Sequence, residues 1–167
     1  MNTAVGQELL HFVDGEIDGV TIEWLDSHVD HRGLLVELFR HDELHQNEWP
    51  VMAYLSQTKP GVVRGPHEHR EQTDVFVFLG NGQWRVYLWD HRADSVTRGR
   101  RQRIDVEQDE WLRVVVPPGV VHAYQNVGSK PAWVFNGANR LYAGEGRKSP
   151  VDEIRHEDRP GSPYAID

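Results

Sequence analysis

Cysteine is absent from the 167-residue sequence, and several other features are scarce. The lack of cysteine excludes a disulfide framework, thiolate catalysis and thiolate metal sites. No stretch approaches the ~20 consecutive apolar residues of a membrane-spanning helix, so the sequence predicts no membrane partner. Lys and Arg number 18 against 26 Asp and Glu, and the resulting net charge of −8 argues against a nucleic-acid partner. The N-terminus lacks the basic start and apolar block of a signal peptide, so we expect a cytoplasmic protein.

Short β-strands separated by Gly, Pro and Asn are the main pattern in the chain, and strong helix patterns are scarce. Apolar runs predict strands over residues 20–25, 34–39, 51–55, 74–79, 84–89, 104–106, 111–116, 121–125 and 132–135. The Asn81-Gly82 pair predicts a tight hairpin between residues 74–79 and 84–89. Many short strands of this kind are typical of an all-β sandwich or barrel.

The two ends of the chain differ from the middle. Residues 1–18 are acidic and weakly patterned, and residues 143–167 combine Gly and Pro with many charges. We therefore expect a single domain, with a barrel over residues 19–142, an N-terminal arm over 1–18 and an extended tail over 143–167 that packs on the barrel.

Histidine is unusually frequent, with ten copies. Seven lie in polar segments, in the arm, in the tail or at a strand end, and we expect no function for them: His11, His28, His31, His41, His45, His91 and His156. His67 and His69 are two residues apart, so on a strand they share one face. His122 follows a rigid Pro-Pro-Gly turn, and a small barrel could bring it opposite the first pair. These three histidines are the candidate site.

The segments around these histidines, residues 61–80 and 117–126, resemble the two cupin motifs. The first contains a glycine, His-x-His, an acid and a second glycine, with Asp74 where the motif usually has glutamate. The second follows the pattern Pro-x-Gly-x-x-His-x-x-x-Asn. The resemblance implies a double-stranded β-helix, or jelly-roll, barrel with its site inside.

Four segments in order resemble the dTDP-4-dehydrorhamnose 3,5-epimerase family, which shares this barrel. They are DHRGLLVELFR (30–40), PGVVRGPH (60–67), DHRADSVTRG (90–99) and VPPGVVH (116–122). The resemblance implies an epimerase or isomerase of a 4-keto-6-deoxy sugar linked to a nucleotide, acting without a cofactor. It also implies a homodimer in which the N-terminal segment of one subunit helps to build the site of the other.

The resemblance assigns roles to several residues. The family's base corresponds to His67, which would remove a proton next to the ketone. Arg64 and His122 correspond to residues around the sugar diphosphate, and Arg32 and Glu37 to residues that hold the nucleotide.

The family's catalytic acid and enolate-stabilising lysine are not matched. Phe135 stands thirteen residues after His122, where the family has its tyrosine acid, and no lysine stands about ten residues after His67. Tyr142, or otherwise His69, is the candidate replacement acid. Tyr124 is a further candidate acid and a candidate substrate-binding residue. For the carboxylate that orients the base, the chain offers three weak candidates: Asp152, Asp158 and Asp167.

The same residues support a second interpretation, a metal-dependent cupin. His67, His69, His122 and Asp74 form a nitrogen and oxygen ligand set suited to Zn, Fe, Mn or Ni. Glu71 competes with Asp74, because it shares strand parity with His67 and His69. Such an enzyme would be an oxygenase, lyase or isomerase of a small oxygenated substrate. A third interpretation is a nucleotide-sugar binding protein without turnover, since the family's acid and lysine are missing.

Overall fold

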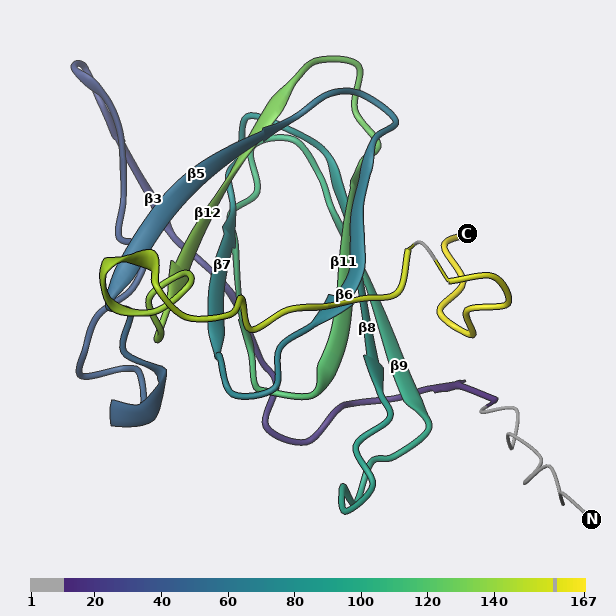
Figure 1. Cartoon of the computed structure of the whole chain (residues 1–167). Coiled ribbons are helices and arrows are strands. Elements are labelled where there is room, and N and C mark those ends of the chain that lie inside the picture. The colour runs from purple at the N-terminus through teal and green to yellow at the C-terminus, as the bar shows by residue number, and fades with distance from the viewer. Residues whose placement is uncertain (1–10, 158) are drawn as a thin grey trace, which may run out of the picture.

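Strands dominate the computed structural model, which describes residues 11–157 and 159–167 (Figure 1). The first sheet has the order β1 (Val13–Asp14), β9 (Arg100–Val106), β8 (Trp84–Asp90), β11 (Val120–Asn126), β6 (Val63–Glu68) and β13 (Ile154–Arg155). The second has the order β2 (Thr21–Trp24), β10 (Leu112–Val116), β7 (Asp74–Phe78), β12 (Ala132–Ala138) and β5 (Met52–Thr58). The hairpin of β3 (Ser27–Asp30) and β4 (Gly33–Val36) stands apart from both. Two short 3-10 helices cover Gln46–Glu48 and Glu145–Arg147.

Consecutive strands cross between the two sheets, so that β5, β6, β7 and β8 alternate from one to the other. This is the jelly-roll barrel that the sequence predicts, and the all-β class is confirmed. The predicted hairpin at Asn81-Gly82 is wrong, because β7 and β8 lie in different sheets. Both edges of β7 are already paired, one with β10 and the other with β12, so the chain must cross to the first sheet after Gly82.

Aromatic and aliphatic side chains fill the space between the sheets at one end of the barrel. The largest members of this core include Phe78, Trp84, Leu88 and Leu112, all nearly inaccessible to solvent. Phe78 and Trp84 pack with ring centroids 5.8 Å apart. Burying each such side chain contributes roughly 1.5–3 kcal/mol to folding. The other end of the barrel is lined by polar side chains, which leaves room for a site.

The C-terminal segment lies across the outer face of the first sheet (Figure 1). Its strand β13 pairs with the end of β6, where Arg155 lies opposite His67. Tyr164 then packs on Trp89 and on Phe12, with ring centroids 5.6 Å apart in each case. Within the expected N-terminal arm, residues 1–10 fall outside the described part, whereas β1 pairs in parallel with β9. None of the helices within the described ranges is long and apolar enough to cross a membrane.

Candidate active site

His67 and His122 are direct cross-strand partners on β6 and β11. Their ring centroids lie 4.4 Å apart. Gly65 permits this close approach: its φ is +88°, and a Cβ atom there would lie 2.5 Å from the backbone oxygen of His122. The Pro-Pro-Gly turn before β11 is also tied to the site, because the Gly119 amide donates a hydrogen bond to the backbone oxygen of His69. The sequence therefore uses two glycines to align the strands that carry the histidines.

His69 lies just beyond the end of β6, on the same face as His67. Its ring centroid is 5.9 Å from that of His67 and 6.0 Å from that of His122. Its Nδ1 atom is hydrogen-bonded to the backbone oxygen of Asp152, and its Nε2 atom lies 3.1 Å from Oδ2 of Asp74. The three histidines are thus brought together as the sequence predicts.

Asp74 completes this group from the opposite sheet, as the first residue of β7. Its Oδ1 atom accepts hydrogen bonds from Gln72 and Asn136, at 2.9 and 3.1 Å. Its Oδ2 atom lies 3.8 Å from Nε2 of His122. Glu71, the competing acid, is exposed and pairs instead with Arg140 at the rim. We call His67, His69, His122 and Asp74 the cavity cluster.

The local environment gives the three imidazoles different proton affinities. Burial, with the neighbouring His122 and His69, lowers the pKa of His67 to about 2, so this ring is uncharged at neutral pH. Burial likewise lowers the pKa of His122. Burial acts in the same direction on His69, but the contact with Asp74 outweighs it and raises the pKa of His69. Burial raises the pKa of Asp74, yet the contact with His69 and the hydrogen bond from Asn136 hold it below its usual value. His67 is therefore held in the uncharged form, whereas the contact with Asp74 favours the charged form of His69.

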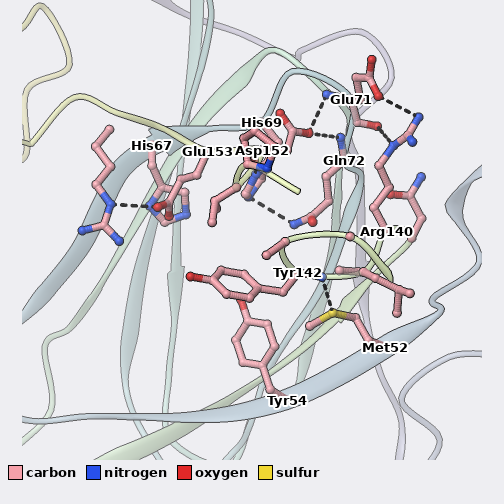
Figure 2. Close-up of a pocket in the computed structure, with 18 of the residues that line it drawn as sticks. Met52, Tyr54, His67, His69, Glu71, Gln72, Arg140, Tyr142, Asp152 and Glu153 are labelled. Atoms are coloured by element: carbon pink, nitrogen blue, oxygen red, sulfur yellow. Dashed lines mark hydrogen bonds and ion pairs between the residues drawn. The ribbon is translucent and has the colours of Figure 1, made fainter. Parts of the chain in front are cut away.

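A cavity of about 930 Å³ opens beside these histidines (Figure 2). Three arginines line it: Arg64, Arg140 and Arg155. Arg64 is held by Thr58 Oγ1 and the Gln57 backbone oxygen, at 3.0 and 2.9 Å. Arginine side chains at a cavity wall suit an anionic group such as a phosphate. The volume is sufficient for a small-molecule ligand.

Tyr142, Tyr124 and Tyr54 also line the cavity, and Figure 2 shows the rings of Tyr142 and Tyr54 extending into it. Tyr142 lies on the loop after β12 and is 58% exposed. Tyr124 is buried, with its hydroxyl 3.0 Å from Ser56 Oγ. The sequence reasoning did not propose Tyr54 for this site. Its hydroxyl accepts a hydrogen bond from Asn136, and burial raises its pKa. Strand alternation could have predicted this position, because Tyr54 and Ser56 are two residues apart on β5 and share one face of it.

Arg32 and Glu37 do not line the cavity of their own chain. Both belong to the segment of the β3–β4 hairpin, which projects away from the barrel (Figure 1). Arg32 is exposed and pairs with Asp30, and Glu37 lies near Arg40. Among the described strands the hairpin pairs only with itself, from Ser27 opposite Val36 to Asp30 opposite Gly33.

Phe135 also lies away from the cavity. It is flanked on β12 by the inward-facing, buried Val134 and Asn136, and strand alternation turns it to the outer face. There its ring lies 6.1 Å from that of Phe39. Phe135 therefore does not line the cavity, and the inward residue beside it, Asn136, is an amide.

Asp152 is the only candidate orienting carboxylate near the site among the residues described. Its two oxygens accept hydrogen bonds from the backbone amides of Arg70, Glu71 and Gln72, each at 2.9 Å. It therefore shapes the loop between β6 and β7 and holds His69 through its own backbone oxygen. Asp167 lies near Arg103 at the C-terminus, and Asp158 falls outside the described residues.

A second histidine cluster lies behind β6, on its outward face. Glu68 is buried, and its two carboxylate oxygens contact His156 Nε2 at 2.8 Å and His91 Nε2 at 2.9 Å. His156 is 5% exposed and His91 is partly buried, so both are held within the fold by Glu68. Tyr164 covers this group, with its ring 4.8 Å from that of His156. We call Glu68, His91 and His156 the outer cluster.

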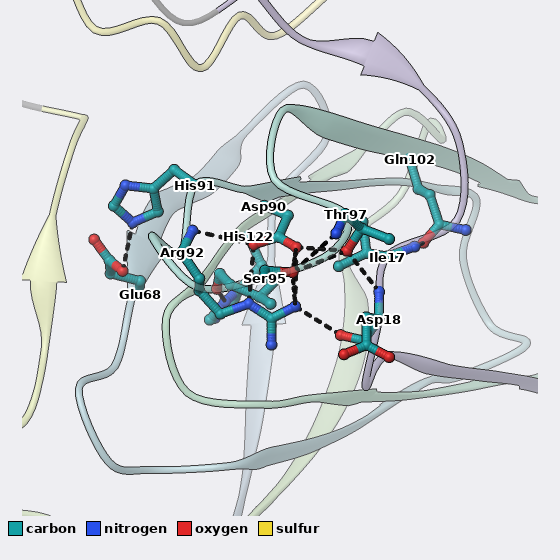
Figure 3. A network of polar contacts seen from close by, with 11 residues as sticks. Ile17, Asp18, Glu68, Asp90, His91, Arg92, Ser95, Thr97, Gln102 and His122 are labelled. Carbon is teal, nitrogen blue, oxygen red and sulfur yellow. Dashed lines mark hydrogen bonds and ion pairs between the residues drawn. The ribbon is translucent and has the colours of Figure 1, made fainter.

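The motif at residues 90–99 builds a turn rather than part of the cavity (Figure 3). The buried carboxylate of Asp90 accepts hydrogen bonds from Arg92, Ser95 and Thr97. Arg92 also donates to the backbone oxygen of Asp18. Although burial opposes it, these bonds hold the pKa of Asp90 well below its usual range. This motif therefore stabilises the connection between β8 and β9.

Comparison with known proteins gives a consistent result. A family model described as dTDP-4-dehydrorhamnose 3,5-epimerase matches residues 14–152. The spore coat polysaccharide biosynthesis protein SpsL of Bacillus subtilis is 36% identical over 119 residues, 71% of this chain and 78% of that protein. A probable low-salt glycan biosynthesis epimerase of Haloferax volcanii is 35% identical over 75% of this chain and 81% of its own length. The fold is shared with the rmlC epimerase of Mycobacterium tuberculosis, with a TM-score of 0.74, 19% identity and coverage of 92% and 76% of the two chains.

Proposed function

The chain belongs to the dTDP-4-dehydrorhamnose 3,5-epimerase family and is thus a sugar-nucleotide epimerase, and we propose that it acts on a 4-keto-6-deoxy sugar linked to dTDP. The observation that carries this proposal is the position of His67, whose imidazole packs on His122 at the wall of an arginine-lined cavity. An uncharged imidazole beside a bound ketone is the group that proton abstraction requires.

The reaction begins with His67 as the base. A proton leaves a carbon next to the C4 ketone and moves to the imidazole, and the electron pair of the C–H bond forms an enolate. Donors near the developing oxyanion lower the energy of this enolate. His69 is the candidate donor, because its ring lies 5.9 Å from that of His67 and the contact with Asp74 raises its pKa.

A second group returns a proton to the opposite face of the same carbon, which inverts the centre. Tyr142 fits this role best, because its ring enters the cavity from the loop after β12, with His69 as the alternative. Base, stabiliser and acid are then all side chains, and proton transfer of this kind needs no cofactor. A cytoplasmic location belongs to the same proposal, because nucleotide-linked sugars are made from nucleoside triphosphates.

Arg64 is the main candidate to hold the sugar diphosphate. Its guanidinium is anchored by Thr58 and by the Gln57 backbone at the cavity wall. Tyr124 lines the same wall on the neighbouring strand β11, where His122 is buried opposite His67. A guanidinium presents several donors to phosphate oxygens in a fixed plane, which favours binding of a diphosphate over a neutral sugar.

We propose a homodimer in which the β3–β4 hairpin brings Arg32 and Glu37 to the cavity of the partner. The hairpin carries the exposed apolar residues Val29, Leu34 and Leu35, which a monomer would leave in water. Mixing two inactive variants tests this arrangement. Arg32→Ala and His67→Gln subunits, unfolded and refolded together, should regain about a quarter of the sites if each cavity needs both chains. Mixtures that stay inactive would count against a shared site.

Incubation with dTDP-4-keto-6-deoxyglucose in D2O tests the proposed reaction itself. Proton abstraction should introduce deuterium at C3 or C5, detected by mass spectrometry and NMR. His67→Gln is the matched inactive variant, and His45→Ala, an exposed histidine outside both the cavity and the β3–β4 hairpin, is the active control. Calorimetry on the same samples distinguishes two negative results. Nucleotide-sugar binding without deuterium exchange would indicate a binding protein without turnover, and absence of both binding and exchange would overturn the proposed substrate.

A further inference from the structure

Tyr54 lies on β5, in the sheet opposite the one that carries His67. Both side chains line the cavity, and their strands β5 and β6 stand on opposite sides of the barrel (Figure 1). A sugar held between the two sheets therefore meets His67 on one side and Tyr54 on the other. Tyr124 does not offer this geometry, because its strand β11 is the neighbour of β6 in the first sheet.

The hydrogen bonds around Tyr54 determine the direction in which its hydroxyl donates. Tyr54 is the cross-strand partner of Asn136 on β12, and Nδ2 of Asn136 lies 2.8 Å from the hydroxyl oxygen. The same Nδ2 atom donates to Oδ1 of Asp74 at 3.1 Å. An ionised carboxylate only accepts hydrogen bonds, so the amide nitrogen of Asn136, and not its oxygen, faces both groups. Tyr54 therefore accepts from Asn136, and its own proton is available to an acceptor in the cavity.

The same contacts suit a hydroxyl that gives up its proton to a substrate. Burial and the nearby charge of Asp74 raise the pKa of Tyr54, so the hydroxyl is protonated throughout the neutral range. Asn136 is 2% exposed, which fixes the position of its amide. When the proton leaves, Nδ2 of Asn136 already points at the oxygen and stabilises the phenolate without rearrangement. Strand β5 thus supplies the proton, and β12 supplies the group that stabilises the resulting charge.

We propose that Tyr54 returns a proton to one of the two carbons that flank the C4 ketone, from the face opposite His67. The assignment rests on the proposed function, in which Tyr142 donates from the loop after β12, and a second donor allows both carbons to be inverted. The electron pair of the enolate forms the new C–H bond with the hydroxyl proton of Tyr54, and the C4 carbonyl forms again. Tyr54 is left as a phenolate and His67 as an imidazolium, and proton exchange with water restores both.

Tyr54→Phe removes only the hydroxyl, and Asn136 keeps its bond to Asp74, so the variant should fold. With dTDP-4-keto-6-deoxyglucose in D2O, NMR measures inversion and deuterium incorporation separately at C3 and at C5. We expect inversion at one of these carbons to fall ~10²-fold or more. Deuterium should still enter at that carbon with retention, because His67 continues to remove the proton and returns a deuteron to the same face. Tyr164→Phe, which loses the same group outside the cavity, is the matched control and should behave as wild type does.

Two results for Tyr54→Phe would overturn the assignment. Inversion of every carbon within about twofold of the wild-type rate at saturating substrate would show that the hydroxyl donates no proton, even if calorimetry finds weaker nucleotide-sugar binding. Equal loss of inversion and deuterium incorporation would show that Tyr54 supports the base instead of acting after it. Wild type tests the proposed function independently. Exchange by wild type with an unaffected Tyr54→Phe removes only this assignment, whereas wild type without exchange removes the proposed reaction as well.

Discussion

The two faces of strand β6 carry histidine clusters with opposite hydrogen-bonding states. On the outward face, each carboxylate oxygen of Glu68 has a histidine partner within 3 Å. On the inward face, Asp74 Oδ2 and His122 Nε2 are buried without such a partner in the described chain. Both clusters combine histidines with a buried carboxylate, so residue type alone does not separate them. Completed hydrogen bonds indicate a structural role, whereas the histidines at the cavity wall, His67 and His69, are available to a substrate.

The largest expected difference is in catalysis. His67→Gln should lower deuterium exchange by about 10³-fold, because general base catalysis contributes ~10²–10⁴-fold. Its free energy of unfolding should change little, since the described residues show no hydrogen bond to the His67 imidazole. The measurements are exchange by mass spectrometry and urea unfolding followed by fluorescence. An active His67→Gln variant would show that another group removes the proton.

Glu68→Ala should have the reverse effect. Removing the carboxylate leaves two histidine nitrogens without their partner, and a lost buried bond of this kind costs about 1–3 kcal/mol. We expect the free energy of unfolding to fall by about 2 kcal/mol while most of the exchange activity remains. Glu71→Ala is the matched control, because its exposed ion pair with Arg140 should contribute less than ~1 kcal/mol. Equal stability of the two variants would contradict the structural role of the outer cluster.

The outer cluster also predicts how stability depends on pH. Burial acts to raise the pKa of Glu68, but hydrogen bonds from His91 and His156 outweigh it and lower the pKa. A carboxyl group with a lowered pKa stabilises the fold fully above its unfolded value, about 4.3 for glutamate, and the stabilisation is lost as pH falls through the folded value. The difference in unfolding free energy between wild type and Glu68→Gln should therefore shrink below pH ~4. A difference that grows in acid would contradict this assignment.

The three histidines of the cavity cluster could be predicted from the sequence because their pattern is local. His67 and His69 are two residues apart, and the Pro-Pro-Gly turn stands directly before the strand of His122. The outer cluster could not, because His91 and His156 are 23 and 88 residues from Glu68 and meet it only in the folded chain. The crossing after Gly82 was missed for the same reason: the partners of β7 are β10 and β12, which lie later in the sequence.

Positions inferred by counting along a motif are sensitive to the face of the strand. Residue 135 is thirteen residues after His122, yet one residue more or less moves a side chain from the outer face to the inner one. The same applies to Arg32 and Glu37, whose hairpin leaves the barrel instead of joining a main sheet. Sequence could therefore predict the barrel and its three histidines, but not which chain or face supplies the remaining groups.

Phe135→Tyr should have the smallest effect. The new hydroxyl would lie on the outer face, near Phe39 and the groove lined by Val36, Leu38 and Leu55, and not among the cavity histidines. We expect the exchange rate to stay within about twofold and the unfolding free energy within ~1 kcal/mol of wild type, as for a partly exposed position. Tyr142→Phe is the matched comparison, because it removes a hydroxyl from a ring that enters the cavity. A large gain in exchange for Phe135→Tyr would show that residue 135 reaches the substrate, and would overturn the division between inner and outer faces.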